Sequence, residues 1–155
     1  MTFNHLVLIG GGHTNVLLIK KWLMSTKLMP EIPVSIISRD SYLVYSAMFP
    51  SVLSKSSSLE ESLIDIISLS KNAKVSFIEE EVKDIDFNLK KIVLSNRPSV
   101  NYSNLVLNYG SQTIIPKEFE SLVKNRNAFS IKPFLRAINQ YSKRIFLIQL
   151  MNFHL

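Results

Sequence analysis

A run of three glycines at residues 10–12 is the part of this sequence whose residue types and spacing best suit chemistry. The run follows a short apolar stretch at residues 5–9 and precedes a stretch with helical periodicity. A glycine turn between a strand and a helix lets a phosphate approach the backbone, and the helix start offers it N–H donors. The chain has only four glycines, and a plain turn needs one or two of them. The pattern therefore favours a dinucleotide-binding turn over a turn without a ligand.

Two positions around this turn leave the kind of dinucleotide open. Asn15 stands where the third glycine of the G-x-G-x-x-G pattern normally permits close packing, so the helix is expected to sit slightly further from the strand. At the end of the next strand, where an acid usually binds the ribose, the sequence has Ser38 and Arg39, and the nearest acid is Asp40. Ser38 could bind a ribose hydroxyl more weakly, and Arg39 could meet a phosphate or be solvated.

Other kinds of catalytic or metal site find no support in the sequence. There is no cysteine, which excludes disulfides, zinc–thiolate sites and dithiol redox centres. The three histidines are scattered, and no Ser-His-Asp or paired-carboxylate spacing is evident. We therefore predict no metal site and assign no catalytic residue, because in flavin or nicotinamide chemistry the cofactor reacts and the protein orients it.

The elements that must position the turn follow a repeating strand–helix–strand (βαβ) order. We expect strands and helices to alternate as in a doubly wound parallel sheet, with the first strand central and its glycine turn at the carboxyl edge. The helix over 59–71 is predicted from a capping box formed by Ser58 and Glu61. The expected strands are 5–9, 34–38, 75–78, 105–108 and 145–148, with a hairpin or meander at 81–96; the expected helices are 13–26, 59–71, 117–126 and 133–142.

The charge of the chain is uneven. The net charge is +6, but residues 1–116 carry 11 basic and 10 acidic side chains, whereas residues 117–155 carry 7 and 2. We interpret the basic tail as solvated helices, so no nucleic-acid partner is expected. No apolar run approaches the ~18 residues that span a bilayer, and the N-terminus lacks a signal-peptide pattern. We expect no transmembrane segment and a cytoplasmic protein.

Four segments in this order carry a resemblance to a known family: HLVLIGGGHTNV at 5–16, YSAMFPS at 45–51, SLIDIISL at 62–69 and YSNLVLNYGS at 102–111. The chain resembles the pyridine nucleotide–disulfide oxidoreductase superfamily, specifically its FAD-dependent NADH dehydrogenase-like branch. Within that branch it is similar to the flavoprotein module associated with selenide, water dikinase. The resemblance covers about residues 5–135. It implies a Rossmann-like FAD-binding fold of the glutathione-reductase type with a small β-meander.

The resemblance also implies a cofactor and its ligands. FAD would be the cofactor, with NAD(P)H as co-substrate and hydride passing from nicotinamide to flavin and on to an acceptor such as a quinone. Disulfide chemistry is excluded because the chain has no cysteine. The implied FAD-binding residues are Gly10, Gly11, Gly12, His13 and Thr14 at the pyrophosphate, Ser38 and Arg39 near the adenosine ribose, Tyr45, Ser46 and Pro50 near the isoalloxazine, and Tyr109, Gly110 and Ser111 in the segment returning to the cofactor.

The chain also departs from the family in ways that bear on its organisation. Family members are more than twice as long and contain a second, nicotinamide-binding unit. We therefore expect the N-terminal part of the FAD/NAD(P)-binding domain at 1–116, a helical linker toward that unit at 117–142, and a truncated tail at 143–155. The alternatives to an oxidoreductase portion are a non-catalytic nucleotide-binding or interaction module, completed by another chain or a selenide, water dikinase-related partner, and an inactive gene remnant.

Overall fold

The structure is a computed structural model that describes residues 4–108, 110, 115–125 and 137–138. Most of the helix expected at 133–142 and all of the strand expected at 145–148 lie outside the described residues. So do Tyr109 and Ser111. The chain divides into two compact units, Met1–Leu43 with Ile64–Tyr109 and Val44–Leu63 with Gly110–Leu155.

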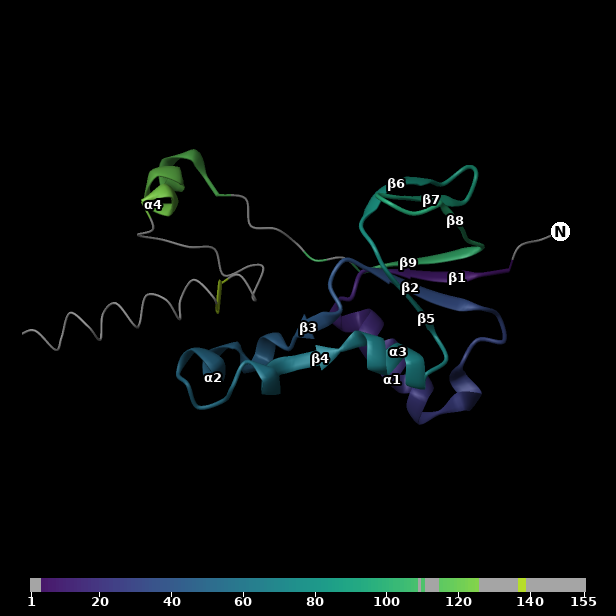
Figure 1. Ribbon diagram of the computed structural model, residues 1–155, viewed down its shortest axis with the longest axis horizontal. Helices are drawn as coiled ribbons and strands as arrows, with labels where there is room; N and C mark the ends of the chain where they lie inside the picture. The colour runs from purple at the N-terminus through teal and green to yellow at the C-terminus, as the bar shows by residue number, and fades with distance from the viewer. Residues whose placement is uncertain (1–3, 109, 111–114, 126–136, 139–155) are drawn as a thin grey trace, which may run out of the picture. The chain divides into compact units, whose positions relative to one another are not determined.

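A parallel sheet of four strands forms the centre of the first unit (Figure 1). Its strands are β1 (Leu6–Ile9), β2 (Val34–Ser38), β5 (Ser76–Glu79) and β9 (Asn104–Leu107), in the order β5-β2-β1-β9. Leu6 pairs with Val34 on one side and with Asn104 on the other. Because every residue of β2 is buried, its sequence lacks the alternation of a half-exposed strand. The expected α/β class and the inner position of β1 are both confirmed.

Helices α1 (His13–Met24) and α3 (Ile66–Asn72) cover one face of this sheet (Figure 1). Helix α1 buries Val16, Ile19 and Trp22 at helical spacing, and these side chains pack with Leu8, Ile36 and other sheet residues in one apolar cluster. A 3₁₀ turn, Thr26–Leu28, follows α1 after Ser25. Helix α1, which directly follows the turn after β1, is therefore held in place by its packing on the sheet.

A three-stranded antiparallel meander covers the other face of the sheet. Its strands are β6 (Val82–Asp86), β7 (Lys91–Leu94) and β8 (Val100–Asn101). Ile92 and Leu94 of the meander pack with Val7, Ile9 and Ile37 of the sheet. Asp86 Oδ1 accepts the N–H groups of the next turn, so the hairpin forms where the sequence predicts it. The first unit is thus a three-layer arrangement of helices, parallel sheet and meander.

The helix predicted over 59–71 is wrong in its first half. The capping box forms as expected, since the Ser58 N–H donates to Glu61 and the Glu61 N–H donates to Ser58. It caps only a 3₁₀ turn, Glu60–Ser62, after which β4 (Leu63–Asp65) pairs with β3 (Tyr42–Val44). Helix α3 begins at Ile66 with Asp65 as its N-cap.

The second unit contributes short helical segments. Besides the Glu60–Ser62 turn, these are a 3₁₀ turn at Ser46–Met48, α2 (Phe49–Leu53), a 3₁₀ turn at Lys117–Phe119 and α4 (Glu120–Lys124). Phe49, Ala137 and Ile138 form its buried apolar cluster. Among the described residues, none of the helices is both long and apolar enough to cross a bilayer.

Candidate functional site

The glycine turn lies at the carboxyl end of β1, between the ends of β2 and β9. Gly10 has φ 93°, a backbone conformation that residues with a Cβ rarely adopt. Its N–H donates to the Ile37 carbonyl at 2.8 Å. Asn108, just after β9, donates its N–H to the Ile9 carbonyl at 2.8 Å. The turn is therefore held on both sides, at the point where strand order reverses and open α/β sheets bind ligands.

Gly11 and Gly12 are required by close packing within the protein. A Cβ at Gly11 would overlap the side chain of Ile66 and lie 2.8 Å from Ser38 Oγ. A Cβ at Gly12 would overlap the Asn108 side-chain amide and lie 2.6 Å from the Asn108 carbonyl oxygen. The backbone conformation of Gly10 and the close packing at Gly11 and Gly12 thus explain all three glycines. The number of glycines is therefore no evidence for a ligand.

Backbone donors at the turn give better support for an anion. The N–H groups of Gly11 and Gly12 have no hydrogen-bond acceptor among the described residues. The first turn of α1 contains no acidic residue. Unpaired N–H groups beside a helix N-terminus attract phosphate through hydrogen bonds and through the helix dipole. The geometry of the turn therefore suits a phosphate or pyrophosphate.

The first N–H groups inside α1 already have an acceptor. Gly12 is the N-cap residue and has no side chain to cap the helix. Instead, the orientation of the Asn108 amide that satisfies its neighbours places Oδ1 2.9 Å from the Thr14 N–H nitrogen and 3.2 Å from that of Asn15. The same oxygen accepts from Thr14 Oγ1 at 2.9 Å. The sequence holds no local signal for this role of Asn108, because the residue follows β9 and caps a helix far away along the chain.

Asn15 is buried at the start of α1, beside the end of β1. Its side chain is fully buried and Nδ2 donates to the Ile9 carbonyl at 3.2 Å and to the Gly10 carbonyl at 2.9 Å. Its Oδ1 has no hydrogen-bond partner among the described residues. The amide that replaces glycine thus joins α1 to the end of β1 through hydrogen bonds.

The structure brings some of the predicted ligands to the turn. Ser38 is adjacent to Gly11, but its hydroxyl donates to the Asp40 carbonyl at 2.8 Å and accepts from the Asp40 N–H at 3.3 Å. A ribose would have to compete with these bonds. The Arg39 side chain is 66% exposed and forms a 3.5 Å ion pair with Asp40. His13 begins α1 and is half-buried, and Thr14 next to it is exposed.

The other predicted ligands belong to the second unit or are not described. Tyr45, Ser46 and Pro50 are exposed in the second unit. Gly110 is exposed, and Tyr109 and Ser111 lie outside the described residues. The roles assigned to these six residues stay predictions.

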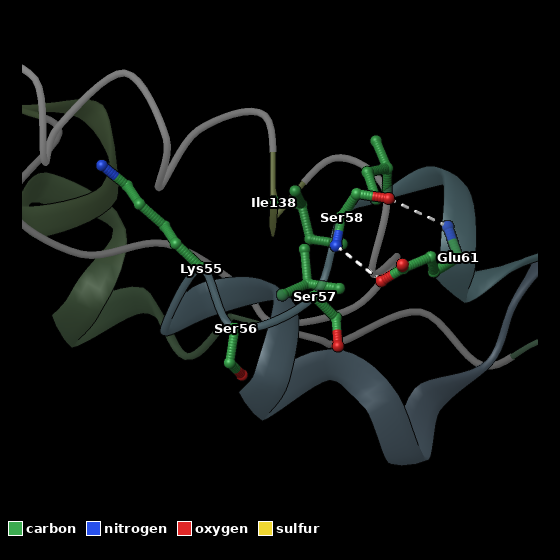
Figure 2. Close-up of a pocket in the computed structure, with 8 residues that line it drawn as sticks. Lys55, Ser56, Ser57, Ser58, Glu61 and Ile138 are labelled. Carbon is green, nitrogen blue, oxygen red and sulfur yellow. Dashed lines mark hydrogen bonds between the residues drawn. The ribbon is translucent and has the colours of Figure 1, made fainter.

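A hollow of about 470 Å³ in the second unit involves none of the predicted ligands (Figure 2). It is lined by Val52, Lys55, Ser56, Ser57, Ser58, Leu59, Glu61 and Ile138. Figure 2 shows the Ser58–Glu61 hydrogen bonds on its wall. The hollow is lined by one basic and one acidic residue, Lys55 and Glu61, so its lining carries no net charge.

Asp65 has a structural role at the start of α3. Its Oδ1 accepts the Ser68 N–H at 2.9 Å and its Oδ2 accepts the Ser68 hydroxyl at 2.6 Å. The Ser68 hydroxyl and then the Ser68 N–H hold the pKa of Asp65 below its ordinary value of 3.8. No group of three or more potential metal ligands occurs in the described part of the chain.

Comparisons with known proteins find similarity in structure. No family model matches the sequence, and no curated protein matches it significantly. The sulfide:quinone oxidoreductase of the hyperthermophilic bacterium Aquifex aeolicus aligns with a TM-score of 0.76 and 22% identity, over 94% of this chain and 32% of that chain. NADH:rubredoxin oxidoreductase from Clostridium acetobutylicum aligns with a TM-score of 0.58 and 20% identity, over 73% and 29%.

A third structure with the same fold is the water-forming NADH oxidase of Lactobacillus brevis, bound to NADH. It aligns with a TM-score of 0.59 and 19% identity, over 80% of this chain and 32% of that chain. The chain therefore spans about a third of the length of the structures it matches. At this level of identity the likeness establishes a shared Rossmann-like fold.

Proposed function

We propose that this chain is the FAD-binding portion of an NAD(P)H-dependent flavoprotein oxidoreductase and that its glycine turn holds the pyrophosphate of the cofactor. The observation that supports this proposal best is the pair of unpartnered N–H groups at Gly11 and Gly12, which lie at the switch point of the sheet. The names of the compared structures, which are oxidoreductases, agree with it.

The residues around the turn fit a dinucleotide anion. Two N–H donors, the dipole of a twelve-residue helix and the absence of acids in its first turn all favour negative charge there. Arg39 is exposed at the end of β2, where the adenosine side of the cofactor would lie, and its guanidinium could meet a phosphate or stack on the adenine. The Ser38 hydroxyl already donates to the Asp40 carbonyl and accepts from the Asp40 N–H, so it could offer the cofactor only its second acceptor lone pair.

The redox step belongs to the cofactor, which accepts a hydride from reduced nicotinamide when it is bound. The chain's own task in this proposal is to hold and orient it. Tyr45, Ser46 and Pro50 are proposed to lie near the isoalloxazine, and Tyr109, Gly110 and Ser111 are proposed to form the segment that returns to the cofactor. A complementing chain or a selenide, water dikinase-related partner is proposed to complete the site.

A second candidate function is a nucleotide-binding or interaction module without catalysis. The packing of Gly11 and Gly12 against Ser38 and Asn108 favours it, because this packing explains the glycines without any cofactor. The two functions differ in whether bound flavin is reduced.

The test is a calorimetric titration of the purified chain with FAD, ADP and riboflavin, together with its visible absorbance spectrum. The oxidoreductase proposal predicts that FAD and ADP bind and riboflavin does not, since riboflavin lacks phosphate. Arg39→Ala should weaken ADP binding severalfold, whereas the matched variant Arg97→Ala, on the meander layer, should not. ADP binding without FAD binding would favour the non-catalytic module. A folded chain that binds none of them contradicts both nucleotide-binding proposals.

A further inference from the structure

The outer face of the helical layer combines exposed lysines with exposed aliphatic side chains. On α1, residues 17, 20, 21 and 24 form one stripe at helical spacing, opposite the buried Val16, Ile19 and Trp22. This stripe consists of Leu17, Lys20, Lys21 and Met24, and it continues into Lys27 and Leu28 of the following 3₁₀ turn. We call these residues, together with Ile67, Lys71 and Lys74, the helical face.

Helix α3 adds to the helical face because it lies beside α1 on the same side of the sheet (Figure 1). Ile67 and Lys71 are four residues apart on its exposed side. Lys74 follows the helix with φ 58° and is also exposed.

The charge of the helical face has one sign. It carries five exposed lysines, and residues 13–28 and 66–74 contain no acid. Within the part of the chain that the structure describes, the one ion pair is Arg39–Asp40, so none of the five lysines is paired with a carboxylate. The meander layer differs, since its lysines alternate with Asp84 and Asp86.

The apolar side chains of the helical face are exposed to solvent rather than buried in the core. Met24 is 77% exposed, Leu17 is 52% exposed and Leu28 is 50% exposed. Ile67 is 42% exposed. These side chains stand among the lysines, so the same face offers both the apolar area and the positive charge that strengthen binding to an anionic bilayer.

We propose that the helical face binds the surface of an anionic lipid bilayer, with the lysines on the headgroups and the aliphatic side chains at the acyl boundary. Nucleic acid is the less suitable partner, because the face has no arginine and no exposed aromatic ring for base stacking. The proposal concerns peripheral attachment and does not depend on the proposed cofactor.

The experiment is co-sedimentation of the full chain with vesicles of phosphatidylcholine alone or with added phosphatidylserine. We expect binding to the anionic vesicles only, and release when salt reduces the Debye length from ~8 Å to ~3 Å. Each lysine near such a surface strengthens binding about fivefold, so Lys20→Gln/Lys21→Gln/Lys71→Gln should weaken it on the order of 100-fold.

Matched variants on the meander layer separate this face from net charge. Lys83→Gln/Lys90→Gln/Lys91→Gln removes the same charge and should leave most of the binding, and Lys117→Gln/Lys124→Gln tests the basic tail. Leu17→Ser/Met24→Ser should weaken binding, whereas Phe87→Ser/Leu89→Ser, at side chains 66% and 72% exposed on the meander hairpin, should not. Far-UV circular dichroism of each variant confirms folding.

Three results would overturn the proposal. The first is equal binding, or none, of the wild-type chain to neutral and anionic vesicles. The second is an equal loss with the meander or tail variants, which would indicate attraction by total charge. The third is binding to duplex DNA or to polyglutamate that depends on the helical face, without binding to vesicles.

Discussion

Replacing Gly12 with alanine tests whether the turn is as tightly packed as the structure indicates. The backbone of Gly12 has φ −71° and ψ 167°, which alanine adopts without strain, so the effect comes from the new Cβ alone. That Cβ would lie 2.6 Å from the Asn108 carbonyl oxygen, a backbone atom held by the pairing of β9 with β1. Overpacking of this kind costs about 1–3 kcal/mol.

The loss of chain freedom in the unfolded state offsets about 0.4–1 kcal/mol of this cost. The expected net destabilisation is therefore about 1–2 kcal/mol, a fall in Tm of roughly 3–6 °C for a chain of this size. Gly110→Ala is the matched control, because a Cβ there meets no atom within 4 Å. Thermal unfolding followed by circular dichroism measures both. If Gly12→Ala and Gly110→Ala melt at the same temperature, the described packing of the turn is incorrect.

Three further variants test other contacts of the first unit. Asn108→Ala removes the acceptor of the Thr14 and Asn15 N–H groups and should lower stability by about 0.5–2 kcal/mol, measured by urea unfolding, whereas Asn108→Asp, which keeps an acceptor, should not. Asp65→Asn should lower the unfolding midpoint at neutral pH. Because the pKa of Asp65 is lowered in the folded state, its contribution is present above pH 3.8 and is lost as pH falls through the folded pKa; a difference between wild type and variant that persists at pH well below that value contradicts the cap. Trp22→Ala should lower the free energy of unfolding by about 3–5 kcal/mol in the same urea assay, because Trp22 is buried. If Trp22→Ala destabilised the chain less than Lys20→Ala does, Trp22 would not lie in the core.

Local patterns in the sequence predicted the first part of the fold well. The strand at residues 34–38 and the helix from residue 13 follow from apolar periodicity, which depends only on neighbouring residues. The reversal of strand order around β1 follows from the handedness of βα connections. The glycine turn was correctly placed, although its three glycines are explained by packing.

The errors arose where two local signals compete or where a contact joins distant segments. Ser58 and Glu61 form their capping box, yet Asp65 is the cap of the longer helix, because Leu63–Asp65 pairs as a strand with β3. The Asn108 cap joins residues far apart in sequence and could not be inferred from spacing. The expected slightly larger separation of α1 from β1 at Asn15 stays a prediction, whereas the hydrogen bonds from its amide to the Ile9 and Gly10 carbonyls could not be inferred from spacing.

The cap supplied by Asn108 has a consequence for the order in which the chain folds. Helix α1 and strand β1 are adjacent in sequence and can form early, but the first donors of α1 gain their acceptor only after β9 has docked beside β1. Contacts of such large sequence separation close slowly. During synthesis the glycine turn should therefore reach its final geometry only after residue 108 has left the ribosome, and pulse-labelled hydrogen exchange should show the Thr14 and Asn15 amides becoming protected together with β9.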